Sequence, residues 1–228
     1  MFRQEQSADI VIIGGSTGGC AAALAAAKAG CKVIMTEETS WIGGQLTNQA
    51  VPPDEHRWIE QFGCTRSYRK FRNSVRQYYL RNFPVTEQAR RMTGFNPGTA
   101  NVSRISHEPR VALAVIQDML APFVNSGKLM IMTETKVRAA ETNGDNVTSV
   151  EVEHVNTKQV CVLTAPYFLD ATDCGDVLPL AGVEYVTGAE SQKETGEPHA
   201  WQASLIRWIC KPLLIVFLLI MLKDTISR

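Results

Sequence analysis

The sequence has no long apolar run, no pair of cysteines at metal-binding spacing and no excess of charge of either sign. Its longest uninterrupted apolar segment, residues 212–222, has eleven residues, whereas a membrane-spanning helix needs about 20. The six cysteines include no CxxC pair and form no compact cluster with histidines. Because structural zinc and iron–sulfur sites use such clusters, we predict no metal site.

The charge balance and the N-terminus argue against two further classes of protein. Residues 56–110 carry eleven Arg or Lys against three Glu, and residues 141–197 carry eleven Asp or Glu against two Lys, for a formal net charge of zero. The basic part contains no nucleic-acid-binding motif, so we expect no nucleic-acid partner. The polar N-terminus MFRQEQS does not fit a signal peptide. We therefore expect a cytoplasmic protein, with membrane association through residues 212–222 as the alternative.

Residues 8–38 have the order strand, glycine turn, helix, strand and acidic end that is typical of a βαβ nucleotide-binding unit. The β-branched run at residues 10–13 predicts a buried parallel strand. The alanine-rich residues 20–29 favour a helix that lies close against a sheet. A second apolar strand is expected over residues 32–36. The fold class that follows is α/β with a Rossmann-like parallel sheet.

The glycine turn predicts a dinucleotide site, because glycines allow a tight bend, contact with a pyrophosphate and close strand–helix packing. Serine stands at the middle glycine of the GxGxxG pattern. Glu37, 23 residues after Gly14, has the position of a carboxylate that binds ribose hydroxyls, which favours FAD or NAD over NADP. A purely structural turn and a solvated Glu37 are the alternatives. The candidate turn residues are Gly14, Gly15, Ser16, Gly18 and Gly19.

A second glycine pair, Gly43 and Gly44, follows in TSWIGGQLT (residues 39–47). The order of strand, GGxxGG turn, alanine helix, VIMTEE and WIGGQLT resembles the FAD-dependent oxidoreductases of the glutathione-reductase-like class with two dinucleotide-binding domains. The run AVPPDEHRWIEQFGCTRSYRKFRNSVRQYY also resembles a bacterial family of FAD-dependent oxidoreductases, some carrying a xanthan-lyase-related label. The resemblance implies FAD as cofactor. It places Gly43 and Gly44 along the FAD pyrophosphate and points Gln45 towards the flavin.

The same resemblance implies contacts at the other end of FAD. It assigns adenine to the backbone of Val137. The loop Ala171, Thr172 and Asp173 matches the second FAD fingerprint, usually a form of ATG, with Asp173 where glycine is common. Helix capping by Asp173 and Asp176 is the alternative for the end of this loop.

The remaining pattern predicts helices between the two nucleotide-binding parts. Tyr68, Phe71 and Val75 recur at helical spacing within residues 66–83, with arginines between them whose stems cover apolar surface. A second helix is expected over residues 106–120. Strands are expected at residues 129–132, 135–140, 147–153, 159–164 and 167–170, the middle three forming a β-meander. The expected parts are residues 8–50 and 129–185 for FAD binding, 51–128 as an inserted helical substrate region, and 186–200 as the start of a truncated substrate domain.

Proton transfer beside a flavin has three candidates, Asp54, Glu55 and His56, because histidine titrates near neutrality and a carboxylate can orient it. A solvated polar loop is the alternative. His107 and Arg110 could reach an anionic substrate, with a capping or surface role as the alternative.

The last 28 residues, 201–228, differ in character from the preceding hydrophilic stretch. Back-translation in another frame yields a family-like continuation, so we expect a frameshifted tail on a fold that is incomplete at its C-terminus. The sequence thus predicts a piece of a FAD-dependent oxidoreductase that acts on an unidentified small molecule, with its oligomeric state open. The alternatives are an NAD-dependent Rossmann dehydrogenase, or a non-catalytic truncated product with a membrane-associating tail.

Overall fold

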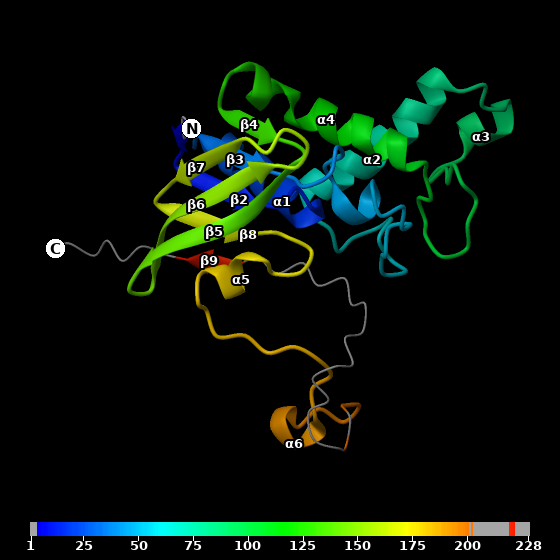
Figure 1. The fold of residues 1–228 in the computed structure, drawn as a ribbon. Helices are drawn as coiled ribbons and strands as arrows, with labels where there is room; N and C mark the ends of the chain where they lie inside the picture. The colour runs from blue at the N-terminus through cyan, green and yellow to red at the C-terminus, as the bar shows by residue number, and fades with distance from the viewer. Residues whose placement is uncertain (1–3, 201, 203–218, 222–228) are drawn as a thin grey trace.

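A parallel sheet forms the centre of the protein (Figure 1), whose computed structural model describes residues 4–200, 202 and 219–221. The strand order of this sheet is β4-β3-β2-β8-β9. All neighbours are parallel except β9, which is antiparallel to β8. This confirms the predicted parallel sheet. Its strands are β2 (Ile10–Ile13), β3 (Val33–Thr36), β4 (Leu129–Met132), β8 (Tyr167–Asp170) and β9 (Leu219–Met221).

A second sheet has the strand order β1-β7-β6-β5. Its antiparallel part, β5 to β7, confirms the predicted β-meander. Strand β1 pairs in parallel with β7 and is the element that the sequence pattern did not indicate. Its residues are polar and mostly exposed, as an edge strand allows, so no apolar alternation reveals it. The strands are β1 (Gln4–Ser7), β5 (Thr135–Asn143), β6 (Asn146–His154) and β7 (Val160–Thr164).

The parallel sheet lies between a helical layer and the meander sheet. In β2, the side chain of Ile12 belongs to the core on the helical side, whereas Val11 and Ile13 belong to the core on the meander side. Because side chains alternate along a strand, burial on both faces requires the continuous apolar run seen in the sequence. The helices of this layer are α1 (Thr17–Lys28), α2 (Arg66–Asn82) and α4 (Pro109–Asn125).

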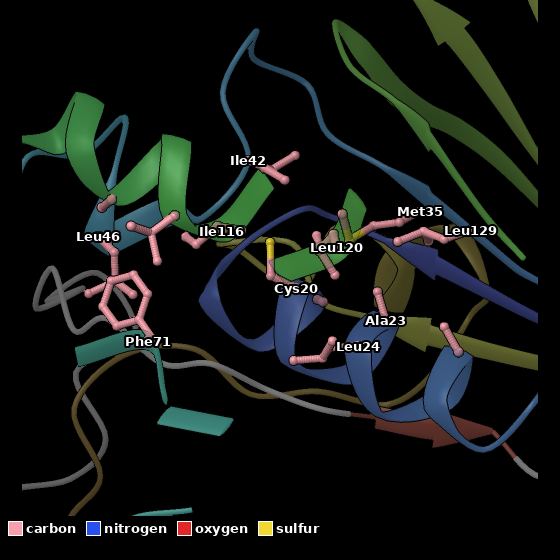
Figure 2. Close-up of a cluster of buried hydrophobic side chains, with 14 of the residues drawn as sticks. Cys20, Ala23, Leu24, Met35, Ile42, Leu46, Phe71, Ile116, Leu120 and Leu129 are labelled. Carbon is pink, nitrogen blue, oxygen red and sulfur yellow. The ribbon is translucent and has the colours of Figure 1, made fainter. Parts of the chain in front are cut away.

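The helical segment shares the core of the nucleotide-binding part. Figure 2 shows Phe71 of α2 beside Leu46, and Ile116 and Leu120 of α4 in the same cluster as Ala23 of α1. Helix α2 therefore packs against α4, and α4 contacts α1 and strand β4 of the sheet. The shorter helices are the 3-10 turn η1 (Gly44–Leu46), α3 (Glu87–Arg91), α5 (Val177–Leu180) and α6 (Gln192–Thr195).

A buried ion-pair network fixes the loop before α2. The Arg72 side chain is 0% exposed, so its guanidinium is buried, which the amphipathic spacing of α2 did not indicate. Its Nε and Nη2 donate to the two carboxylate oxygens of Glu55 at 2.7 and 3.0 Å. Nη1 and Nη2 donate to Glu60 at 3.0 and 2.8 Å. Tyr68 donates its hydroxyl to Glu55, and Arg76 also binds Glu60. A buried guanidinium is tolerated because each of its three nitrogens donates to a carboxylate.

In the part of the chain that the structure describes, no helix has the length and apolar character to cross a membrane. Of the predicted frameshifted tail, only residue 202 and β9 are described, and β9 covers the edge of the sheet beside β8. The rest of residues 201–228, including most of the apolar segment 212–222, lies outside the described residues.

Candidate cofactor site

The first and third glycines of the turn between β2 and α1 are required by close backbone contacts. A Cβ on Gly14 would lie 2.3 Å from the carbonyl oxygen of Ala171, and the φ of Gly14 is +102°. A Cβ on Gly19 would lie 2.1 Å from the carbonyl oxygen of Gly14. These distances leave no room for a side chain. The turn and α1 are therefore in backbone contact, which is the close strand–helix packing that the glycine pattern predicted. The turn is also in backbone contact with the β8 loop.

The serine at the middle position of the pattern is the N-cap of α1. Its Oγ accepts a hydrogen bond from the backbone N–H of Gly19 at 3.2 Å. Within residues 4–200, the backbone N–H groups of Ser16, Thr17 and Gly18 have no acceptor. Unpaired amides at the positive end of a helix form an anion site. The departure from GxGxxG thus preserves the feature that a diphosphate needs.

The second glycine pair is docked on this turn. The N–H of Gly43 donates to the carbonyl of Gly15 at 2.7 Å, and Thr17 Oγ1 donates to the carbonyl of Gly43 at 2.8 Å. A Cβ on Gly44 would lie 3.1 Å from the Cα of Ser16. The structure therefore brings Gly43 and Gly44 next to the first turn. Gln45 is half-buried and does not line the cleft described below.

Glu37 is a fixed acceptor at the end of β3. It is only 7% exposed, so the alternative of a solvated carboxylate was wrong. Its Oε2 accepts from the N–H of Gly15 at 3.0 Å, and its Oε1 accepts from the N–H and hydroxyl of Thr39 at 2.9 and 2.7 Å. Burial raises the pKa of Glu37 against the effect of these hydrogen bonds. Since Oε2 has one donor, it retains acceptor capacity for a ligand hydroxyl.

The loop after β8 is organised by Asp170, a residue that the sequence analysis did not single out. Its Oδ1 accepts from the N–H and hydroxyl of Thr172 at 3.0 and 2.7 Å, and its Oδ2 accepts from the N–H of Val177 at 2.9 Å. The N–H of Ala171 donates to the carbonyl of Ile13. The sequence did contain a signal for Asp170, because this acid ends the apolar strand YFLD.

The two later acids of this loop do not cap a helix with their side chains. Asp173 Oδ2 accepts from Nε2 of Gln49 at 2.8 Å. Asp176 occupies the N-cap position of α5, but its side chain makes no capping hydrogen bond. Burial, and then the charges of Asp170 and Asp173, raise the pKa of Asp176.

These segments enclose a cleft of about 470 Å³, including the part open to solvent, at the carboxyl edge of the parallel sheet. An edge of this kind is where open α/β sheets bind nucleotides. The cleft joins Ser16, which carries the first of the three unpaired amides, with Glu37 and the first residues of β5. The lining includes Gly14, Ser16, Glu37, Glu38, Val137, Ala171, Thr172, Asp173, Cys174 and Asp176. The donors and acceptors present fit the adenosine diphosphate half of a dinucleotide.

The family model described as FAD dependent oxidoreductase matches residues 9–217 of this sequence. The chain belongs to the FAD dependent oxidoreductase family. Membership supports FAD over the NAD alternative as the cofactor. The match continues past residue 200, into the segment for which the sequence predicts a frameshift.

One solved structure shows the same fold at low sequence identity, and a second is reported with it. Sdh1 from Mycobacterium smegmatis in complex with UQ1 is similar, with a TM-score of 0.50, 12% identity, and coverage of 75% of this chain and 34% of that chain. The glycerol-3-phosphate dehydrogenase from Bacillus halodurans complexed with FAD has a TM-score of 0.48, 12% identity, and coverage of 77% and 36%. The chain thus spans about a third of the length of these two proteins. No curated protein matches the chain.

None of the predicted proton-transfer residues is among the residues that line the cleft. Glu55 is bound to Arg72 and its side chain is 2% exposed, so it has a structural role. Asp54 is exposed. The ring of His56 lies near Trp58 and Phe62, and its Nε2 is 3.3 Å from the carbonyl oxygen of Gly63. In the described part of the chain, no carboxylate orients His56.

His107 is the other histidine of the helical region. Its Nδ1 lies 3.3 Å from the carbonyl oxygen of Glu108, so this nitrogen carries the proton and Nε2 is an acceptor. Of the buried side-chain polar atoms in the described residues, His107 Nε2 and Ser106 Oγ are those without a partner. Burial lowers the pKa of His107. Arg110 lies over the ring of Trp41 at 5.9 Å.

Among the residues that the structure describes, no group of three or more His, Cys, Asp or Glu side chains could hold a metal ion.

Proposed function

We propose that the cleft binds the adenosine diphosphate half of FAD and that the whole protein is an oxidoreductase acting on a small molecule. The observation that carries the proposal is the convergence of three unpaired turn amides, a buried carboxylate and the β8 loop at one sheet edge. Bound flavin supplies hydride or electron transfer, for which the protein provides binding and orientation.

Each segment has a distinct part in the proposed site. The amides of Ser16, Thr17 and Gly18 donate to the diphosphate, with the positive end of α1 behind them. Gly43 and Gly44 keep side chains away from this path. Glu37 accepts from ribose hydroxyls, which also disfavours a 2′-phosphate at the same position. The Val137 backbone contacts adenine, and the backbone of the loop of Ala171, Thr172 and Asp173 closes the site at β8.

The test is titration of the purified, flavin-free chain with FAD, followed by quenching of flavin fluorescence. Glu37→Gln should weaken FAD binding about 10-fold or more, because a hydrogen bond to a charged acceptor contributes about 1.5–3 kcal/mol. Glu38→Gln is the matched control, since Glu38 is the next acid in the chain, lines the same cleft and is exposed. Absence of FAD binding by the unsubstituted chain, or equal losses in both variants, would contradict the proposal.

The site also predicts a pH dependence of FAD binding. Burial raises the pKa of Glu37, and the ribose hydroxyls need its ionised form as acceptor. FAD affinity should therefore fall as the pH is lowered through the raised pKa of Glu37. In Glu37→Gln this part of the pH dependence should be absent.

We propose a cytoplasmic location for the protein. What supports it is the state of the cysteines at 20, 31, 64, 161 and 174, which are all free thiols. Cell fractionation tests the location. For residues 201–228 the proposal of a frameshift stands on the sequence pattern, and resequencing of the coding DNA tests it.

A further inference from the structure

A side-chain hydrogen bond joins the two loops that border the diphosphate-binding turn. Nε2 of Gln49 donates to Oδ2 of Asp173 at 2.8 Å, across 124 residues of sequence. The backbone N–H of Gln49 donates to the carbonyl of Gly44 at 3.3 Å, which places Gln49 beside the second glycine pair. On the other side, a Cβ on Gly14 would lie 2.5 Å from the backbone nitrogen of Thr172. Asp173 is thus one residue away from direct contact with the glycine turn.

The charge of Asp173 is unfavourable for an anionic ligand. Asp173 lines the same cleft as Glu37, Glu38 and Asp176, where Lys136 is the cation among the lining residues. Its negative charge contributes to the raised pKa of Glu37, so the two carboxylates interact. A diphosphate at the turn amides would add further negative charge to this cleft.

The hydrogen bond from Gln49 fixes where the Asp173 carboxylate lies. A free carboxylate could approach the unpaired amides of the turn, where it would compete with a diphosphate. Within residues 4–200, however, Asp173 makes no hydrogen bond to those amides, and its side chain accepts from Gln49. The neutral amide of Gln49 donates to the carboxylate without adding charge, and it fixes the direction of the side chain.

We infer that Gln49 is a positioning residue of the cofactor site, which holds the Asp173 carboxylate on its own side of the cleft and keeps the turn amides open to an anionic nucleotide. The inference rests on the proposed function, because the anion in question is the FAD diphosphate. Asp173 is then an internal competitor for the anion site, and Gln49 suppresses that competition.

The experiment compares FAD dissociation constants of the unsubstituted chain, Gln49→Ala, Asp173→Ala and the double variant. Gln49→Ala should weaken FAD binding roughly 5–10-fold. This is less than the effect of removing a buried hydrogen bond to a charged group, because both side chains are partly exposed. Asp173→Ala should bind FAD at least as tightly as the unsubstituted chain. In the double variant the loss should be rescued, because Gln49 has no carboxylate left to position.

A matched control is Gln61→Ala, which removes an exposed glutamine outside the cleft and should leave FAD affinity unchanged. The inference is overturned if Gln49→Ala binds FAD as tightly as the unsubstituted chain, or if the double variant binds as weakly as Gln49→Ala. In both cases the unsubstituted chain binds FAD, so the proposed function stands. Failure of the unsubstituted chain to bind FAD would instead remove the proposed function and this inference together.

Discussion

Replacement of Arg72 by methionine should destabilise the protein far more than the loss of a surface arginine. Methionine retains much of the apolar stem but leaves Glu55 without its cation, and the Glu55 side chain is 2% exposed. Among the residues that the structure describes, only the hydroxyl of Tyr68 would still donate to that carboxylate. Glu60 is 27% exposed and keeps Arg76, so it can remain hydrated and paired. The cost therefore arises mainly at Glu55.

Removal of one partner of a buried ion pair costs about 3–5 kcal/mol, because an uncompensated charge remains in the interior. For a chain of this length, 1 kcal/mol corresponds to a shift of about 2–4 °C, so the thermal midpoint should fall by about 6–20 °C. The double variant Arg72→Met/Glu55→Gln should recover much of this loss, since no buried charge is then unpaired.

The assay is thermal unfolding followed by far-ultraviolet circular dichroism, with urea unfolding as a second measurement. Arg91→Met is the control, because the Arg91–Glu87 pair has exposed side chains at 78% and 70% and should change stability by no more than about 0.5 kcal/mol. A loss below about 1 kcal/mol in Arg72→Met would refute the assigned role of the buried charge. Equal losses in the single and double variants would instead attribute the effect to packing.

Two further predictions concern the glycine turn and acid stability. Gly19→Ala should lower the thermal midpoint and abolish FAD binding, because its Cβ would lie 2.1 Å from a backbone oxygen. The control is Gly30→Ala, whose Cβ meets nothing within 4 Å and which should cost only the strain of its positive φ, about 1–3 kcal/mol. Similar thermal midpoints in the two variants would contradict the packing argument. Hydrogen bonds from Arg72 lead the effects that lower the pKa of Glu60 from 4.5 to about 2. A lowered folded-state pKa stabilises the fold above the unfolded pKa, so this contribution should be lost as the pH falls from about 4.5 towards 2. Urea midpoints against pH should be flatter for Glu60→Gln in this window, and an unchanged slope would exclude the contribution.

Local pattern was sufficient to predict the central βαβ unit and the meander. Strands β2, β4 and β8 lie at the predicted residues, because a parallel strand buried on both faces must be a short apolar run. The glycines and Glu37 were also identifiable, since close backbone approach and a strand-end carboxylate leave a residue-type signature at fixed spacing.

Other features depend on partners that are distant in sequence. Amphipathic spacing describes which face of α2 is apolar, but it cannot show that Glu55 and Glu60 neutralise Arg72 inside the protein. The polar strand β1 forms because β7 offers an open edge, which no local pattern reveals.

The sequence alone determined the fold class and the kind of ligand, because burial on both sheet faces and backbone contact with a diphosphate each restrict residue type within a short segment. The tertiary structure alone decided which polar residues serve the site and which serve the fold. It assigned Glu55 to an ion pair, Ser16 to a helix cap, Asp170 to the β8 loop and Gln49 to Asp173. A polar side chain takes its role from the donor or acceptor that it meets in space, and that partner is set by packing.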